Sequence, residues 1–292
     1  MSQEIKFTKM HGLGNDFVVI DAISQSIDLT TEQIQKIADR HFGVGCDQLL
    51  LVEKPTDRSA DMPEEAQAEF RYRIFNRDGG EVEQCGNGAR CFALFVRQQG
   101  LTTNNVILVE TAGGLIQLQV TGEQGDEVIV DMGEPDFRPE SLPFLAENRA
   151  ETYNLMVNGV EYAIGAISMG NPHAVMQVDN LDEIDIETLG SAIEAHQQFP
   201  NRVNAGFMQI INRDEFRLRV YERGVGETQA CGTGACAAMA VARMQGLLNE
   251  QVTAHLTGGD LSIQWSGEGQ TLLMTGPATT VFQGKLIVSK EL

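Results

Sequence analysis

Residues Phe70–Leu101 read FRYRIFNRDGGEVEQCGNGARCFALFVRQQGL, and residues Phe216–Leu247 read FRLRVYERGVGETQACGTGACAAMAVARMQGL. With a constant offset of 146, 14 of these 32 positions are identical and no gap is needed. Both copies contain the pattern Cys-Gly-x-Gly-Ala, which starts at Cys85 and at Cys231. A match of this length indicates an internal duplication, and therefore two halves of similar structure.

The duplication extends beyond the cysteine segments. TAGGL at residues 111–115 corresponds to TGGDL at residues 257–261, and Gly-Asn at residues 14–15 corresponds to Gly-Asn at residues 170–171. Upstream of the cysteine segments the offset is 156 instead of 146, so the two copies differ there by about ten residues of loop. From these limits we predict an N-terminal domain over residues 1–135, joined by a returning C-terminal strand at about 279–292, and a C-terminal domain over residues 136–278.

Local patterns predict the same order of elements in each half. Residues 71–75 and 217–221 alternate apolar and charged side chains, as strands with one covered face do. Thr30 and Asp185 are typical caps of a following helix, and a glycine ends the helix after each cysteine. The first cysteine helix is apolar on most sides, which indicates a central position. We therefore predict an α+β fold of two pseudo-symmetric domains, each a curved, mostly antiparallel, barrel-like sheet around a central helix.

Composition restricts the class of protein. Hydrophobic residues make up 42% of the chain and charged residues 21%, as in soluble globular proteins, and no apolar run is long enough to cross a membrane. Five cysteines without a signal peptide favour a reducing, cytoplasmic location. The net charge of −20 argues against nucleic-acid partners. We expect the acidic residues 57–69 to form a solvated loop.

A cysteine at the start of a glycine-rich helix lies at the positive end of the helix dipole. Both the dipole and nearby backbone N–H groups favour the thiolate, which predicts a pKa below the ordinary value of about 8.5. The same N–H groups suit a carboxylate whose α-carbon gains negative charge. Two thiols facing one site are what inversion of a carbon requires, since Cys85 and Cys231 can remove a proton from one face and return it to the other. This chemistry needs no electron-sink cofactor.

Other interpretations of the cysteines are weaker. The spacings Cys85-x5-Cys91 and Cys231-x4-Cys236 do not match a zinc site, so we predict no metal. Cys91 and Cys236 are expected in the core and Cys46 is interpreted as structural. A redox couple between Cys85 and Cys231 stays open.

Polar residues occur in matching turns of the two copies. They are Asn15, Gln48 and Asn76 in the first copy, and Asn171, Asn204 and Glu222-Arg223 in the second. A single asparagine is more often a turn former than a ligand, but pairs placed around two cysteines indicate a polar pocket. Arg223 suits a substrate carboxylate through its guanidinium fork, and His173 stands where it can tune a thiol.

Together these motifs resemble the diaminopimelate epimerase family. The resemblance covers essentially the whole chain and rests on HGLGNDFVVID (residues 11–21), FGVGCDQ (42–48), RIFNRDGGEVEQCGNGARC (73–91), GNPHAV (170–175), RVNAGF (202–207) and YERGVGETQACGTGACA (221–237). It implies an isomerase, independent of pyridoxal phosphate, that interconverts LL- and meso-diaminopimelate by a two-base thiolate/thiol mechanism. The reaction belongs to lysine and peptidoglycan precursor synthesis.

The resemblance also implies roles for individual residues and a cytoplasmic homodimer. The catalytic set is Cys85, Cys231, His173 and Glu222; the substrate-binding set is Asn15, Gln48, Asn76, Gly86, Asn87, Asn171, Asn204, Glu222, Arg223, Gly232 and Thr233. Family dimers use an aromatic residue near the C-terminus, often Tyr, where this chain has Phe282. Two alternatives remain: another cofactor-independent racemase or isomerase, acting for instance on proline or hydroxyproline, and a dithiol redox protein.

Overall fold

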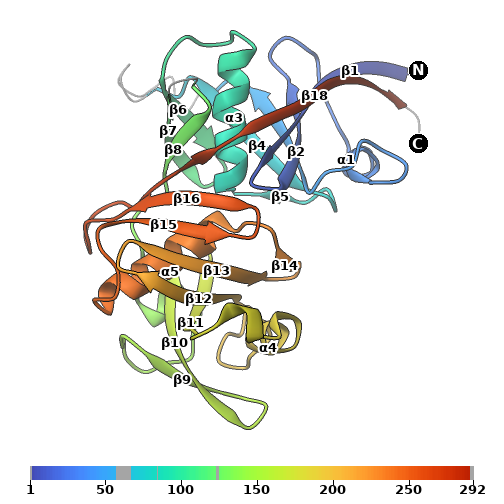
Figure 1. The fold of residues 1–292 in the computed structure, drawn as a ribbon. Coiled ribbons are helices and arrows are strands. Elements are labelled where there is room, and N and C mark those ends of the chain that lie inside the picture. The colour runs from blue at the N-terminus through green and yellow to red at the C-terminus, as the bar shows by residue number, and fades with distance from the viewer. Residues whose placement is uncertain (1, 57–66, 84, 123–124, 290–292) are drawn as a thin grey trace. The chain divides into compact units, whose positions relative to one another are not determined.

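The computed structural model describes residues 2–56, 67–83, 85–122 and 125–289. Contacts divide the chain into two units: unit 1 comprises residues 1–130 and 276–292, and unit 2 comprises residues 131–275. Most of the expected acidic loop at residues 57–69 lies outside the described residues. Figure 1 shows strands and few helices, which confirms the predicted α+β class.

Unit 1 is a sheet wrapped on one long helix. Its elements are β1 (Ser2–Gly12), β2 (Asn15–Asp21), α1 (Thr31–Ala38), β3 (Gln48–Glu53), β4 (Phe70–Asn76), β5 (Glu81–Val82), α3 (Gly86–Gln98), β6 (Val106–Thr111), β7 (Gly114–Thr121), β8 (Glu127–Asp131) and β18 (Thr279–Ser289). The strands pair in the order β18-β1-β2-β3-β4-β6-β7-β8, with β5 also on β4. Only β2–β3 and β4–β6 are parallel among these pairs.

Unit 2 repeats this plan. Its elements are η2 (Pro139–Ser141), β9 (Tyr153–Val157), β10 (Val160–Ser168), β11 (Pro172–Gln177), η3 (Leu181–Glu183), α4 (Ile186–Glu194), β12 (Asn204–Asn212), β13 (Glu215–Glu222), β14 (Gly226–Thr228), α5 (Gly232–Met244), β15 (Gln251–Leu256), β16 (Gly259–Gln264) and β17 (Leu273–Pro277). The order is β9-β10-β11-β12-β13-β15-β16-β17, with β14 on β13. The parallel pairs, β11–β12 and β13–β15, occupy the same steps as in unit 1.

The barrel-like sheets predicted from the sequence are open. Among the described residues no pairing joins β8 to β18 in unit 1, or β9 to β17 in unit 2. The returning tail forms β18, which pairs antiparallel with β1 over most of its length (Figure 1). The duplication of sequence is thus a duplication of topology.

Both short helices begin at the predicted caps. The Thr30 side chain accepts from the Gln33 backbone N–H while the Gln33 side chain accepts from Thr30, which completes a capping box. In α4 the Asp185 side chain accepts from the Thr188 N–H. The helices then end at Ala38 and Glu194.

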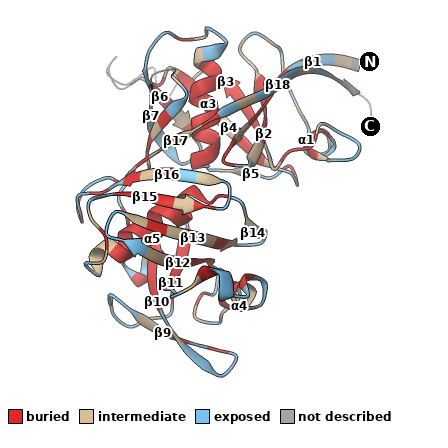
Figure 2. Ribbon diagram, viewed as in Figure 1, coloured by how far each residue is buried: buried red, intermediate tan, exposed pale blue. Residues whose placement is uncertain are grey.

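Both cysteine helices are largely buried (Figure 2). Every residue from Gly86 to Val96 is buried, as predicted for a central helix. Both helices end in the same way: Gly100 and Gly246 take positive φ, and the next residue, Leu101 or Leu247, donates its N–H to the carbonyl five residues back, that of Val96 or Ala242. The glycines fix where each helix stops, and the matching lengths fix where each cysteine lies.

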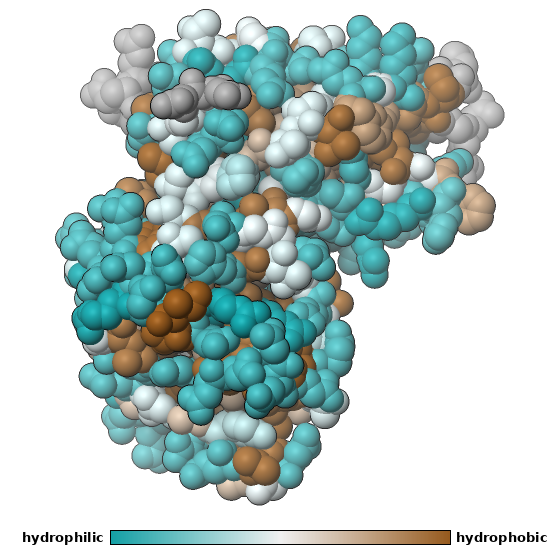
Figure 3. Space-filling model, viewed as in Figure 1, coloured by the Kyte–Doolittle hydropathy of each residue, from teal (hydrophilic) through white to brown (hydrophobic). Residues whose placement is uncertain are grey.

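The face shown in Figure 3 is largely hydrophilic, with hydrophobic residues in scattered groups. This agrees with a chain that carries a formal charge of −20. No helix in the described part of the chain is both long and apolar enough to cross a membrane.

Candidate active site

In unit 1 the expected site residues gather at one edge of the sheet. Strands β2 and β3 are parallel and begin at Asn15 and Gln48, while the antiparallel β4 ends at Asn76, so all three residues lie at the same edge. Helix α3 begins at this edge, over β2 and β4. A Cβ on Gly88 would lie 2.6 Å from the Tyr72 hydroxyl, so this start is packed as tightly as a glycine allows.

Cys85 is the N-cap of α3, with extended backbone. Its sulfur lies 3.7 Å from Oδ1 of Asn15, and the same oxygen accepts a hydrogen bond of 3.2 Å from Nδ2 of Asn87. Asn87 is buried in the first turn of the helix. Gly86 is the first residue of α3, and backbone N–H groups of a first turn have no partner within their helix. The structure therefore brings Cys85, Asn15, Gly86 and Asn87 together.

A cluster of charged residues holds the side chain of Asn15 through a hydrogen bond to Asp47. Nδ2 of Asn15 donates to Asp47 at 3.1 Å, and Arg40 bridges Asp47 and Asp16 at 2.7 Å each. Burial alone would raise the pKa of Asp16, but hydrogen bonds from Arg40 and Lys9 hold it well below its usual range. Asp16 therefore keeps its negative charge at every ordinary pH.

Gln48 and Asn76 form a second polar pair at this edge. They are directly opposite in the β3–β4 ladder, and Nε2 of Gln48 donates to Oδ1 of Asn76 at 2.9 Å. Oε1 of Gln48 is buried and has no hydrogen-bond partner among the described residues. An acceptor left unsatisfied in this way costs about 1–3 kcal/mol, which a donor on a bound ligand would recover.

Unit 2 builds the corresponding edge with different side chains. Cys231 is the buried N-cap of α5, and its sulfur lies 3.6 Å from the Thr233 hydroxyl. That hydroxyl accepts from Nδ2 of Asn171 at 3.4 Å, and Oδ1 of Asn171 lies 3.0 Å from Nε2 of His173. A chain of contacts thus links His173 to Cys231, with Gly232 beside it as the first residue of the helix.

The prediction of a low thiol pKa is wrong for Cys231. Burial raises its pKa well above the ordinary value, and the negative charge of Glu222 raises it further. The Thr233 hydroxyl and the Gly234 N–H act in the opposite direction but are outweighed. The dipole of a helix contributes only about 0.3–1 kcal/mol, up to about 2 when partly buried, which is less than full burial of a thiolate costs. Cys231 is a thiol at neutral pH.

Glu222 ends β13 and Arg223 follows it, and both are held by neighbouring groups. Thr228 donates to Glu222 at 2.5 Å. The backbone N–H of Arg223 donates to Oδ1 of Asn204 at 2.9 Å, and Asn204 in turn donates to the carbonyl of Pro172 at 3.0 Å. The Arg223 side chain is exposed, with one guanidinium N–H directed to the carbonyl of Asn201. Asn204 therefore shapes the turn that presents Arg223.

His173 does not contact a thiol directly. Burial, with a smaller contribution from the charge of Arg223, lowers its pKa from 6.5 to about 3, so the ring is neutral. The contacts that connect the His173 ring to Cys231 run through Asn171 and Thr233, and the neutral ring has no acidic proton to give near neutral pH.

This burial predicts an acid-dependent loss of stability. Between pH 6.5 and 4.5 the unfolded His173 gains a proton that the folded ring does not take up, so stability falls by about 1.4 kcal/mol per pH unit. His173→Phe introduces the residue that Phe17 supplies in the first copy and removes this contribution. Guanidinium unfolding of both proteins at pH 6.5, 5.5 and 4.5 measures the two slopes; equal slopes would contradict a neutral buried His173.

The remaining cysteines lie in the core, as predicted for Cys91 and Cys236, which are fully buried. Burial raises the pKa of the Cys46 thiol to about 12. None of the five cysteines, each of which lies within the described ranges, forms a disulfide. The described residues contain no group of three or more His, Cys, Asp or Glu side chains that could hold a metal ion.

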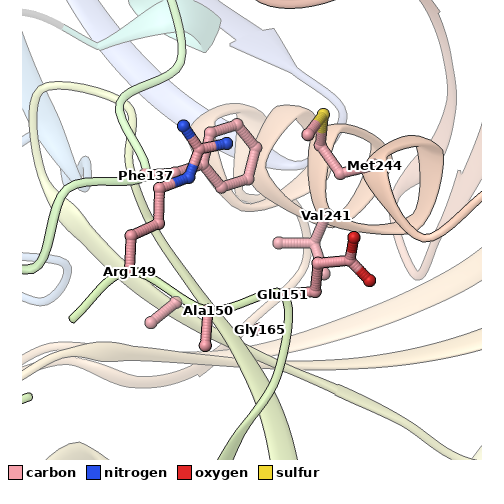
Figure 4. A pocket seen from close by; sticks show the side chains of 8 residues that line it. Phe137, Arg149, Ala150, Glu151, Gly165, Val241 and Met244 are labelled. Carbon is pink, nitrogen blue, oxygen red and sulfur yellow. The ribbon is translucent and has the colours of Figure 1, made fainter.

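A small cavity in unit 2 lies apart from these residues (Figure 4). Its volume of about 20 Å³ is that of a packing gap, and the Arg149 guanidinium covers the Phe137 ring beside it at 5.1 Å. A shallow groove near His196 in the same unit is wider, at about 290 Å³, and open to solvent. Neither contains a residue predicted to act on substrate.

Three residues that support the site could not be singled out from the sequence motifs: Asp47, Arg90 and Thr228. For Arg90 the sequence does contain a signal, because it is a basic residue in a helix that is otherwise apolar on most sides. The second copy has Cys236 at the corresponding position. Asp47 directly precedes Gln48, but nothing in the sequence shows which groups its carboxylate binds.

The family model described as diaminopimelate epimerase matches residues 7–138 and 165–281. Proteins named diaminopimelate epimerase from Thioalkalivibrio sulfidiphilus and Chromobacterium violaceum are each 58% identical over 283 residues, which is 97% of this chain and 99% of theirs. The chain belongs to the diaminopimelate epimerase family. A protein of the same name from Teredinibacter turnerae is 56% identical over 282 residues, again 97% of this chain and 99% of the relative.

Solved structures outside this family share the fold. A hydroxyproline epimerase from Agrobacterium vitis superposes with a TM-score of 0.70 at 15% identity, over 99% of this chain and 94% of that one. A PhzF-family phenazine biosynthesis protein from Bacillus anthracis gives 0.65 at 18%, over 98% and 100%. At these identities the likeness extends to the fold alone.

Proposed function

We propose that this protein interconverts LL- and meso-diaminopimelate without pyridoxal phosphate, by removing and returning the proton at one α-carbon. The observation that carries the proposal is that each unit of a diaminopimelate epimerase family member places a cysteine at the N-cap of its buried central helix. Cys85 and Cys231 are the two proton-carrying groups. The reaction serves lysine and peptidoglycan precursor synthesis.

The helix starts are suited to the reacting carboxylate. Removal of the α-proton puts negative charge on the carbon and its carboxylate, and backbone N–H groups of a first helical turn stabilise such charge. Gly86 with Asn87, and Gly232 with Thr233, supply these positions in the two units. The first residue of each helix, Gly86 or Gly232, has no Cβ, so a carboxylate can approach its backbone N–H closely.

The protonation state of Cys231 assigns it a starting role. In one direction of the reaction Cys85 is the base that removes the α-proton, and Cys231, as a thiol, donates a proton to the opposite face of the same carbon. After one turnover the roles are reversed, which matches a reversible epimerisation. Glu222 and the hydrogen-bonded series from His173 to Thr233 adjust the proton affinity of Cys231.

The remaining polar residues are assigned to recognition of the two amino-acid ends. Oε1 of Gln48 accepts from a substrate ammonium, which satisfies its buried lone pairs. Asn15, Asn76, Asn171 and Asn204 offer both donors and acceptors without net charge, as a zwitterion requires. Arg223, exposed at the end of β13, binds a carboxylate through its guanidinium fork.

We also propose a cytoplasmic homodimer. A reducing compartment favours cysteines without disulfides, and all five described cysteines are free of them. Strand β18 exposes Val281, Phe282 and Ile287 by 54%, 47% and 66%, a set of apolar side chains suited to a protein contact. Sedimentation equilibrium measures the assembly directly, and a monomer at micromolar concentration would overturn it.

Proton NMR of LL-diaminopimelate with reduced protein in D2O, without added pyridoxal phosphate, tests the function. Loss of the α-proton signal together with appearance of the meso isomer is the expected result. Parallel samples with proline and hydroxyproline test the alternative racemases. No exchange of diaminopimelate, with both thiols titrated as free, would overturn the proposal.

A further inference from the structure

Four side chains of unit 1 form a hydrogen-bonded series, called here the amide chain: Arg90, Asn87, Asn15 and Asp47. Nη2 of Arg90 donates to Oδ1 of Asn87 at 3.0 Å. Nδ2 of Asn87 donates to Oδ1 of Asn15 at 3.2 Å, and Nδ2 of Asn15 donates to Asp47 at 3.1 Å. Every donor in the chain points from the cation toward the anion.

The chemistry of the two ends fixes this direction. A guanidinium can only donate and a carboxylate can only accept, so the oxygen of Asn87 must face Arg90 and the nitrogen of Asn15 must face Asp47. Side-chain amides are ordinarily ambiguous, since their oxygen and nitrogen can exchange places. Here both amides have one orientation. As a result Oδ1 of Asn15, an acceptor, lies 3.7 Å from the Cys85 sulfur.

Both ends are themselves anchored. Arg90 is fully buried, and its Nε donates to the carbonyl of Pro277 at 3.1 Å. A Cβ on Gly12 would lie 3.0 Å from Nη2 of Arg90, so the guanidinium is tightly enclosed. Asp47 accepts from Arg40 at 2.7 Å and from the backbone N–H of Asp16 at 3.1 Å. Neither end can rotate away without breaking other bonds.

We propose that Arg90 and Asp47 are positioning residues, which fix the two intervening amides so that Asn15 presents an acceptor to Cys85. The inference rests on the proposed function for the role of Cys85. An acceptor beside the sulfur raises the proton affinity that Cys85 needs as the base and directs the proton it takes up, whereas a flipped amide would present N–H groups and favour the thiolate. Asp47 therefore controls the proton affinity of Cys85 through Asn15.

The second copy lacks this device. Val203 and Cys236 stand at the positions of Asp47 and Arg90, so neither charged end exists there. Cys231 instead faces the Thr233 hydroxyl, and in this pair either the sulfur or the oxygen can be the donor. The pseudo-symmetric halves thus hold their two thiols in different ways, and the amide chain belongs to Cys85 alone.

Two buried titratable groups near Cys85 stay neutral near neutral pH. The Tyr72 hydroxyl donates to the Cys85 carbonyl at 3.3 Å, and burial raises the pKa of Tyr72 and of Cys91, so both stay neutral. The charged groups on the neighbouring strands and loop are Lys9, Asp16, Arg40 and Asp47, with Arg90 on α3. Because mass spectrometry identifies which cysteine is alkylated, a titration between pH 6 and 9.5 can be followed at Cys85 itself.

The test is the alkylation rate of Cys85 by iodoacetamide as a function of pH, followed by mass spectrometry in a Cys231→Ser background. Asp47→Asn releases the amide of Asn15, since residue 47 can then donate as well as accept. We expect the apparent pKa of Cys85 to fall by about one unit, which makes alkylation below the pKa about tenfold faster. Asp16→Asn is the matched control, because it removes one negative charge from the same cluster and leaves the bond between Asn15 and Asp47 in place.

Equal shifts in the two variants, or no shift in Asp47→Asn, would overturn the proposal in favour of simple charge removal. If Asp16→Asn does not fold, the comparison is made at 1 M salt, where the Debye length is about 3 Å. A change of amide orientation survives that screening and a long-range charge effect does not. No substrate is used, so the result is separate from the NMR test of the proposed function.

Discussion

Cys231→Ala and Cys85→Ala are each expected to lower kcat for inversion of diaminopimelate by about 10³–10⁴-fold, the upper range for loss of a positioned acid or base. Inversion needs a proton carrier on each face of the carbon. Either variant leaves one carrier, which can exchange a proton only on its own face. The measurement is the rate of meso isomer formation with LL-diaminopimelate as substrate.

Matched controls are present in the same helices. Cys91 and Cys236 are fully buried in α3 and α5 but lie farther along each helix than the N-cap. Alanine at these positions removes a buried sulfur without removing a proton carrier, so kcat should stay within a few-fold of the original. Normal turnover in Cys85→Ala or Cys231→Ala would disprove the two-base assignment.

Gly165→Ala is expected to destabilise unit 2 by about 1–3 kcal/mol, the usual cost of overpacking a core. Gly165 lies in β10 where α5 crosses it, and an added Cβ would lie 2.3 Å from Cγ1 of Val241. No rotamer of an alanine relieves that contact, so the helix must shift. Because α5 carries Cys231 at its start, activity should fall together with stability. Figure 4 shows both residues beside the small cavity.

The matched partner is Val241→Ala, which removes both methyl groups that the new Cβ would meet. In the double variant the added and removed atoms offset one another, so part of the lost stability should return. Urea unfolding of the two single variants and the double variant gives the coupling energy. Strictly additive effects would mean that the clash between these two residues is not the cause.

Much of the fold could be predicted because it depends on local signals. The capping box at Thr30, the acidic cap at Asp185 and the glycines that end the cysteine helices each act within one turn of chain. Because the sequence repeats, the elements predicted for one half could also be expected in the other. Sheet closure could not be predicted, since it depends on pairing between strands that are distant in sequence.

The site was predictable as a set of residues and not as a set of interactions. Asn15, Asn87 and Cys85 were expected near one another, but the orientation of the amides depends on Asp47 and Arg90, which the motifs do not single out. The expected low pKa of Cys231 failed for a related reason. The helix dipole can be inferred from sequence, whereas the burial that outweighs it appears only when β13 and Glu222 pack beside the thiol.

The sequence by itself determined the duplication, the position of each cysteine at the start of a glycine-ended helix, and the family to which the chain belongs. These follow from identical residues at constant spacing, which the chain carries whatever its conformation. Only the tertiary structure decided the charge state of Cys231, the neutrality of His173 and the polarity of the amide chain. Desolvation and hydrogen-bond direction depend on which groups surround an atom, and those neighbours come from strands far apart in the sequence.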